Sequence, residues 1–153
     1  MNLRKQIEEK YVNAIKSKNA DEVNALRLIK SAIKDKDIAN RTSENNTEIN
    51  DQQILVLLQS MIKQRKDSID SFKVASREDL IAKEQFEIDL INQFLPQQLN
   101  EPEIENIINK IIEEKKFSSL KDMGTLMNSI KIDHAGSVDM AIAGKIAKTL
   151  LSS

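Results

Sequence analysis

The sequence contains no cysteine and no tryptophan, and it has only three glycines, two prolines, one tyrosine and four phenylalanines in 153 residues. Without cysteine, the chain has no disulfide, no thiolate metal ligand and no cysteine nucleophile. Three widely separated glycines cannot form a glycine-rich phosphate loop, so nucleotide binding through such a motif is excluded. So little glycine and proline also leaves few turn residues, which favours helices.

The chain also lacks a large excess of charge and any long hydrophobic run. Its formal net charge is -1, which argues against a general polyanion binder, because such binding depends on many basic contacts. The first ten residues hold no apolar core of a signal peptide, and no stretch approaches the roughly 18 apolar residues of a membrane span. We therefore expect a cytoplasmic protein with no membrane contact.

Apolar residues recur every three or four positions along most of the chain, and hydrophobic residues make up 40% of the sequence. This periodicity predicts amphipathic helices. We expect an all-α fold with four helices, arranged as two hairpins, over residues 1–95 and a three-helix module over residues 96–153. The expected helices of the first part cover residues 3–17, 20–39, 51–73 and 76–94, and two of the second part cover residues 119–130 and 137–151. In these last two helices the residues expected to face inward are Leu120, Met123, Met127 and Ile130, and Val138, Ile142, Ile146 and Leu150.

Helix starts are indicated by a small polar residue followed three positions later by an acidic or amide residue, which can return a hydrogen bond. Pro96 should end one helix, whereas Pro102 fits a first helical turn. Gly136 should lie at a tight connection. Five pairs match the start pattern, namely Asn19 with Glu22, Asn50 with Gln53, Ser76 with Asp79, Asn100 with Glu103 and Ser119 with Asp122.

The sequence presents no catalytic or metal-binding constellation. His134 is the only histidine, and no residues around it match a triad or a metal-ligand spacing, so we expect an exposed loop histidine. Arg65 and Glu84 fall near apolar stripes and are predicted to form a buried ion pair. We expect no catalytic residue, no metal and no cofactor.

Two glycines and two basic stripes are the remaining candidates for a binding surface. Gly124 and Gly144 lie inside helical patterns, where glycine costs about 1 kcal/mol relative to alanine. Close helix packing is the expected reason, and the approach of a nucleic-acid backbone is the alternative. Arg27, Lys30 and Lys34 align on one expected helix, and Lys145 and Lys148 align on another; such stripes are usually solvated but can meet RNA phosphates.

Six motifs spread over the whole chain resemble those of the GatB/YqeY family. In chain order they are LRLIKSAI at residues 26–33, MIKQRKDSI at 61–69, REDL at 77–80 with Lys83-Glu84, FLPQQL at 94–99, Asp122-Met123-Gly124, and AGSVDM at 135–140.

The resemblance implies an all-helical protein whose C-terminal module is similar to the tail of the B subunit of aspartyl/glutamyl-tRNA amidotransferase. That enzyme is a carbon–nitrogen ligase with glutamine as amide donor, and its tail helps to engage tRNA. This chain has no counterpart of the catalytic parts of that enzyme. It also departs from the family where Ser137 replaces a common basic residue and where Asn128 replaces a frequent glycine.

We therefore interpret the chain as a non-catalytic helical module that binds tRNA or aminoacyl-tRNA. The alternatives are an adaptor that docks a translation-related protein and, less favoured, an amidotransferase in its own right, which would need a nucleophile and base that the chain does not present. The candidate RNA-binding residues are Gly124, Lys131, Ser137, Lys145 and Lys148, with a secondary basic face at Arg27, Lys30 and Lys34.

Overall fold

The computed structural model describes residues 2–41 and 48–152, and within these ranges it contains seven α-helices, one short 3-10 turn and no strand. The predicted all-α fold class is therefore confirmed for the described residues. The chain divides into two compact units, Met1–Leu95 and Pro96–Ser153. No helix in the described ranges is both long enough and apolar enough to span a membrane.

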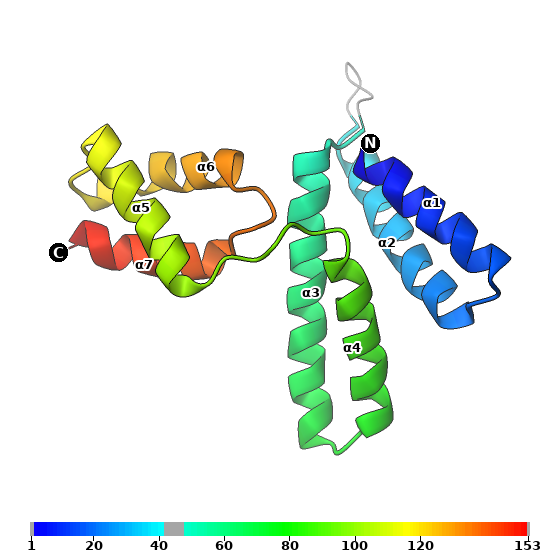
Figure 1. The fold of residues 1–153 in the computed structure, drawn as a ribbon. Helices are drawn as coiled ribbons and strands as arrows, with labels where there is room; N and C mark the ends of the chain where they lie inside the picture. The colour runs from blue at the N-terminus through cyan, green and yellow to red at the C-terminus, as the bar shows by residue number, and fades with distance from the viewer. Residues whose placement is uncertain (1, 42–47, 153) are drawn as a thin grey trace. The chain divides into compact units, whose positions relative to one another are not determined.

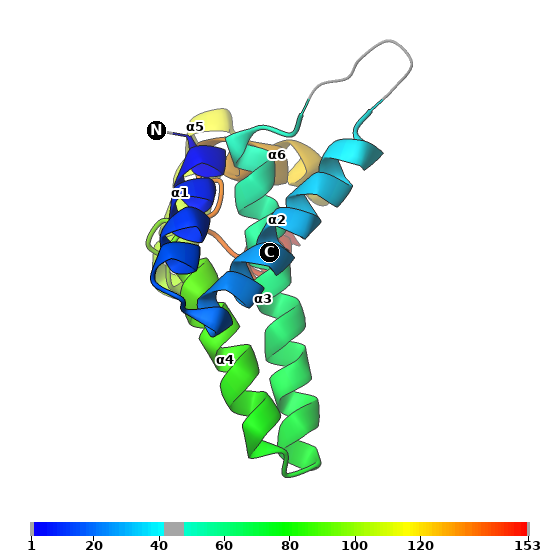
Figure 2. The same cartoon turned by 90° about the vertical axis from the view of Figure 1, so that its right-hand side faces the viewer.

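The N-terminal unit consists of two helical hairpins (Figure 1). Helices α1 (Leu3–Lys16) and α2 (Ala20–Ala39) form one hairpin, and α3 (Asp51–Val74) and α4 (Glu78–Asn92) form the other. Helix α2 packs against both α3 and α4, and α1 contacts α3. The end of the second hairpin extends beyond α1 and α2 (Figure 2), which explains why Val74 is 89% exposed.

An aliphatic core holds the two hairpins together. Leu26, Ile54 and Leu58 are fully buried in it, and each comes from the apolar stripe of its helix. Burying such a side chain contributes about 1.5–3 kcal/mol, so this core is the main source of stability of the unit. Among the described residues, the aromatic side chains in or against this core are Phe94 and Tyr11.

Asparagine caps define where four of the helices begin. Three of these caps were predicted, and the fourth, Asn2, accepts a hydrogen bond from the Lys5 amide at 2.8 Å and escaped the prediction because no acidic or amide residue follows it at the third position. Asn50 and Asn100 each form a complete capping box, and so does Ser119 at the 3-10 turn; Asn19 accepts from the Glu22 amide.

One predicted helix start is wrong. Ser76 does not cap α4, because its φ of 54° lies in the left-handed region and the cap position falls on Arg77. The Arg77 guanidinium instead pairs with Asp79 at 3.2 Å. The short link between α3 and α4 needs a left-handed residue to reverse the chain, and this requirement overrides the capping pattern.

The predicted buried ion pair exists with a different acidic partner. Arg65 pairs with Glu87, not with Glu84, at 2.8 Å, and it also donates a hydrogen bond to the Met61 carbonyl at 3.1 Å. The two side chains are 13% and 9% exposed. Arg65 and Glu87 lie eleven residues on either side of Ser76, so the hairpin turn sets this pairing.

The C-terminal unit contains α5 (Glu101–Lys115), a 3-10 turn (Leu120–Asp122), α6 (Met123–Asp133) and α7 (Met140–Ser152). Pro102 lies in the first turn of α5, and Gly136 has a φ of 79°, as the sequence predicts. Helix α7 contacts α5 and α6. The buried core comprises Ile104, Ile108, Leu126, Ile130, Val138, Ala143, Ala147 and Leu151.

The buried face of α7 is rotated by about one residue from the predicted one. Ala143, Ala147 and Leu151 lie at its centre, whereas the predicted Ile142, Ile146 and Leu150 are only partly buried at its flank. Small residues at the centre let α7 approach two neighbouring helices closely, which the sequence stripe alone does not show. Leu120, also predicted to face inward, is 48% exposed.

The contribution of the Arg65–Glu87 pair to the stability of the α3–α4 hairpin can be tested by substitution. Glu87→Ala should lower the free energy of unfolding by about 3 kcal/mol, because it leaves a buried guanidinium without its partner. Urea denaturation measures this loss. Glu84→Ala is the matched control and should cost less than about 1 kcal/mol, since Glu84 has no partner among the described residues. Equal losses from the two variants would contradict the assigned partner.

Candidate nucleic-acid interface

Helices α6 and α7 meet at Met127 and Gly144, where a Cβ built on Gly144 would lie 3.7 Å from the Met127 Cε. Gly124 and Lys131 lie about one turn on either side of Met127 and therefore share its side of α6. Lys148 lies one turn beyond Gly144 on the same side of α7. Three predicted residues, Gly124, Lys131 and Lys148, thus flank the line along which the two helices meet.

Gly124 has no structural need to be glycine. Its φ is not positive, its surface is exposed, and a Cβ built there would meet nothing within 4 Å. The expectation that close helix packing explains this glycine is therefore wrong, whereas the contact with Met127 fits packing at Gly144. The penalty of about 1 kcal/mol for glycine inside a helix has no explanation in the fold at Gly124.

Ser137 belongs to the connection between α6 and α7. Its hydroxyl donates to the His134 carbonyl at 3.1 Å, and its own carbonyl accepts from the Leu99 amide at 2.9 Å. His134 is half-buried at the C-terminal end of α6, so the expectation of an exposed histidine is wrong. Ser137 therefore fastens this connection to the segment before α5 with its polar atoms.

Lys145 lies about one turn before Lys148 on α7. It lines an open groove of about 230 Å³, and it has no ion pair with Glu105 on the α5 wall. The two lysines are three positions apart on one helix, so they lie on the same side of α7 as predicted, and both are exposed. The groove residues are Glu105, Lys145, Ile146, Thr149 and Leu150.

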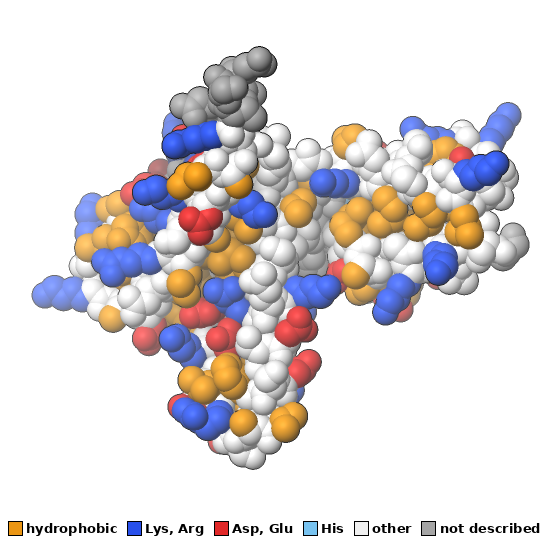
Figure 3. All heavy atoms as spheres, turned by 180° about the vertical axis from the view of Figure 1, so that it is seen from behind, with side chains coloured by type: hydrophobic (Ala, Val, Ile, Leu, Met, Phe, Trp, Pro, Cys, Tyr) orange, Lys and Arg blue, Asp and Glu red, His pale blue; other side chains and the backbone are white. Residues whose placement is uncertain are grey.

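Charge is segregated within the C-terminal unit. Helix α5 carries five of the eight carboxylates of residues 96–153, whereas α7 carries Lys145 and Lys148 and no carboxylate. Seen from behind, the C-terminal unit shows a band of hydrophobic side chains with basic side chains on both sides of it (Figure 3). The net charge of the chain is near zero, but the charged side chains of α7 are all positive.

The secondary basic face is largely engaged within the N-terminal unit. Arg27 donates to the Tyr11 hydroxyl at 3.1 Å. Lys30 lies 2.6 Å from a Glu8 carboxylate oxygen and 4.1 Å from the centre of the Tyr11 ring. Lys34 has no hydrogen bond or ion pair with any described residue. Of the three predicted residues, only Lys34 has neither a hydrogen bond nor an ion pair among the described residues, and only Lys30 has an ion pair.

The sequence did not single out Arg4 and Asp37, which form an ion pair in this region. Arg4 makes two hydrogen bonds to Asp37, at 2.6 and 3.0 Å, and one to the Ile49 carbonyl at 3.1 Å. The Arg4 hydrogen bonds hold the pKa of Asp37 below its ordinary value, and partial burial opposes this shift. The two residues are 33 positions apart, so no local motif could reveal them.

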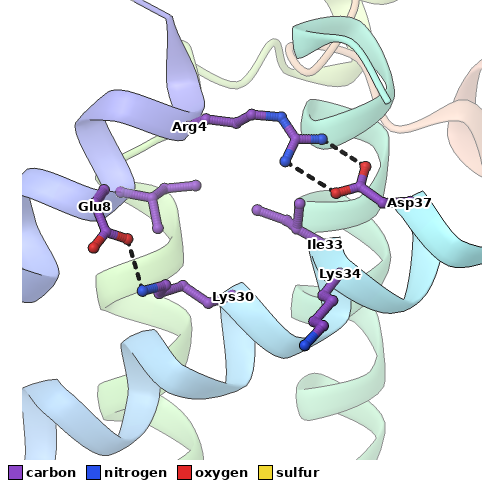
Figure 4. Close-up of a pocket in the computed structure, with 7 residues that line it drawn as sticks. Arg4, Glu8, Lys30, Ile33, Lys34 and Asp37 are labelled. Carbon is purple, nitrogen blue, oxygen red and sulfur yellow. Dashed lines mark hydrogen bonds and ion pairs between the residues drawn. The ribbon is translucent and has the colours of Figure 1, made fainter. Parts of the chain in front are cut away.

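These two residues also line a hollow between α1 and α2, which we call the α1–α2 groove (Figure 4). The groove has a volume of about 140 Å³. Among the described residues, no three His, Asp or Glu side chains come together as metal ligands. The lining residues are Arg4, Ile7, Glu8, Lys30, Ile33, Lys34 and Asp37.

Comparisons with known proteins identify one matching family and several similar proteins. A family model described as Yqey-like protein matches residues 4–151. The chain is similar to Altered inheritance of mitochondria protein 41, mitochondrial, of Pyrenophora tritici-repentis, with 34% identity over 124 residues, 78% of this chain and 66% of that protein. The protein of the same name in Saccharomyces cerevisiae is 32% identical over 111 residues, 67% of this chain.

A third similar protein, an uncharacterized protein of Schizosaccharomyces pombe, is 35% identical over 96 residues, which cover 63% of this chain and 74% of that protein. The match covers 66% of the Pyrenophora protein and 58% of the Saccharomyces protein. The chain thus spans about two thirds or less of the length of these two relatives.

Because the pKa of Asp37 is lowered in the folded protein, the stability of the protein should decrease at acidic pH. The unfolded carboxyl group, with a pKa of about 3.9, binds a proton more readily than the folded one. The stabilisation that the ionised Asp37 carboxylate contributes is therefore complete at pH values above the unfolded pKa of about 3.9. It is lost as the pH falls through the lower pKa that Asp37 has in the folded protein. Asp37→Asn should lower the urea midpoint at pH 7 and reduce the further fall between pH 5 and pH 2.

Asp70 supplies the control for this experiment, because it is exposed and has no partner among the described residues. Asp70→Asn should leave both the midpoint at pH 7 and its acid dependence unchanged. The assignment fails if Asp37→Asn keeps the acid dependence of the unmodified protein.

Proposed function

The chain belongs to the Yqey-like protein family, and we propose that it acts as a non-catalytic helical module that binds tRNA or aminoacyl-tRNA through its C-terminal unit. The location that we propose for this action is the cytoplasm. The observation that carries the proposal is Gly124, an exposed helix glycine that the fold does not require, beside exposed lysines.

An exposed glycine lets another backbone approach a helix more closely than any side chain allows. The ribose-phosphate backbone of an RNA is such a partner, because its contacts need proximity and positive charge but no base recognition. Lys131 lies on the Gly124 side of α6, and Lys148 lies on the facing side of α7, so both ammonium groups are placed to meet phosphates around that approach.

The proposed contact reads shape and charge, not base sequence. The C-terminal unit has a single aromatic residue, Phe117, which packs against the core, so no aromatic platform is available for stacking bases. Recognition through backbone phosphates suits a folded RNA such as tRNA. A few lysines also predict modest affinity with a measurable dependence on salt.

The second candidate function, an adaptor for a translation-related protein, is favoured by one observation. The α1–α2 groove offers an apolar floor beside the unpaired Lys34. This surface belongs to the N-terminal unit and shares no residue with the proposed RNA contact.

Fluorescence anisotropy of labelled total tRNA, titrated with the pure protein at two salt concentrations, tests the RNA contact. We expect binding that weakens at the higher salt. The variant Lys145→Glu with Lys148→Glu should bind more weakly, and the slope of log affinity against log salt should become shallower by about one for each lysine that contacts a phosphate.

Lys110→Glu with Lys115→Glu is the matched control, because it makes the same change of net charge in the same unit, on the acidic helix α5. This control should retain most of the affinity. Absence of binding at low salt, or equal losses in the two double variants, would refute the proposed surface.

A separate prediction concerns Gly124. Gly124→Ala should raise the free energy of unfolding by about 0.5–1 kcal/mol, because alanine favours the helix and its Cβ meets no neighbour. The same variant should weaken tRNA binding, since the Cβ stands where the RNA backbone approaches. Thermal unfolding and anisotropy measure the two effects on one preparation.

Thr125→Ala, on another side of the same helix turn, is the control for the helix preference of alanine. It should leave tRNA binding unchanged. A Gly124→Ala variant that is more stable and binds tRNA as well as the unmodified protein would remove the main support for the RNA contact.

A further inference from the structure

The α1–α2 groove lies in the N-terminal unit and has no part in the proposed RNA contact. Its floor is aliphatic, formed by Ile7 of α1 and Ile33 of α2, which are 2% and 5% exposed. An ion pair bounds each end, Arg4 with Asp37 at one and Lys30 with Glu8 at the other (Figure 4). The groove is therefore apolar in the middle and charged around its rim.

The groove lining holds one more cationic than acidic side chain, and Arg4 pairs in addition with Glu48, outside the lining, at 3.5 Å. Three cationic side chains and two carboxylates line the groove. The carboxylates pair with Arg4 and Lys30, which leaves Lys34 without an ion pair or hydrogen bond among the described residues. An unpaired ammonium group beside an aliphatic floor complements a ligand that carries a carboxylate next to an aliphatic group.

The aliphatic surface continues beyond the groove along α2. Ile38 lies one turn after Lys34, on the same side of the helix, and is 49% exposed. Lys34 thus lies between the buried floor of the groove and the exposed Ile38. A groove between two helices with aliphatic positions spaced in this way fits an amphipathic helix better than a compact small molecule.

We propose that the α1–α2 groove docks an acidic amphipathic segment of a partner protein. One aliphatic side chain of that segment packs over Ile7 and Ile33, a carboxylate reaches Lys34, and a second aliphatic side chain covers Ile38. The ion pair of Arg4 with Asp37 keeps the two groove walls in place. This inference does not depend on RNA binding by the C-terminal unit.

The test begins with selection of 15-residue peptides from a random display library on the intact protein. Binding of the selected peptides is then measured by fluorescence anisotropy. We expect them to compete with one another and to share aliphatic residues spaced three or four positions apart, with Asp or Glu between them.

Substitutions of two exposed residues test whether these peptides bind at the groove, and neither residue belongs to the buried core. Lys34→Glu should weaken their binding by about fivefold or more, because an attraction becomes a repulsion. Ile38→Ser should weaken it without changing its salt dependence. Lys63→Glu makes the same charge change on α3, at an exposed lysine without a described partner, and should have little effect.

Exchanging the charges of Lys34 and of the peptide distinguishes a loss of docking from damage to the fold. A peptide in which the critical Glu is replaced by Lys should bind the Lys34→Glu protein better than the unmodified protein. The proposal is overturned if selected peptides lack acidic residues, if they bind Lys34→Glu unchanged, or if total tRNA displaces them. It is also overturned if sedimentation shows a dimer that Lys34→Glu dissociates, because the occupant is then a second copy of the chain.

Discussion

Burial of aliphatic side chains in two separate cores is the constraint on which the rest of this structure depends. One core lies within residues 3–95 and the other within residues 99–151, and the two share none of the buried residues that the structure describes. With so few aromatic residues, each core relies on isoleucine and leucine from helix stripes. The cores occupy one face of each helix, so polar side chains and the candidate binding residues lie on the remaining faces.

Polar contacts within the N-terminal unit specify how its helices meet. Arg65 and Glu87 match the two arms of the α3–α4 hairpin, and Arg4 with Asp37 joins the two walls of the α1–α2 groove and reaches the Ile49 backbone just before α3. Such pairs add little net stability compared with apolar burial, but removal of one partner is costly. In this structure they fix which residues of the paired helices lie opposite one another.

The two surfaces singled out for function differ in what they offer a partner. On the C-terminal unit, an open glycine and exposed lysines provide room and charge, which suits a phosphate backbone. On the N-terminal unit, most basic residues of the α1–α2 groove and of the secondary basic face contact Tyr11, Glu8 or Asp37, and the groove has an aliphatic floor. One chain therefore presents two chemically distinct surfaces on two separate cores.

The sequence by itself determined the helical class, most helix starts and the tight turn at Gly136, because these depend on periodicity, capping and backbone preference within a few residues. Tertiary structure decided what depends on distant neighbours. It selected Glu87 over Glu84 by the hairpin turn, rotated the buried face of α7 toward two helices, and brought Arg4 to Asp37. It alone distinguished Gly124, beside open space, from Gly144, beside Met127, because the space around a residue is set by the packing of the whole unit.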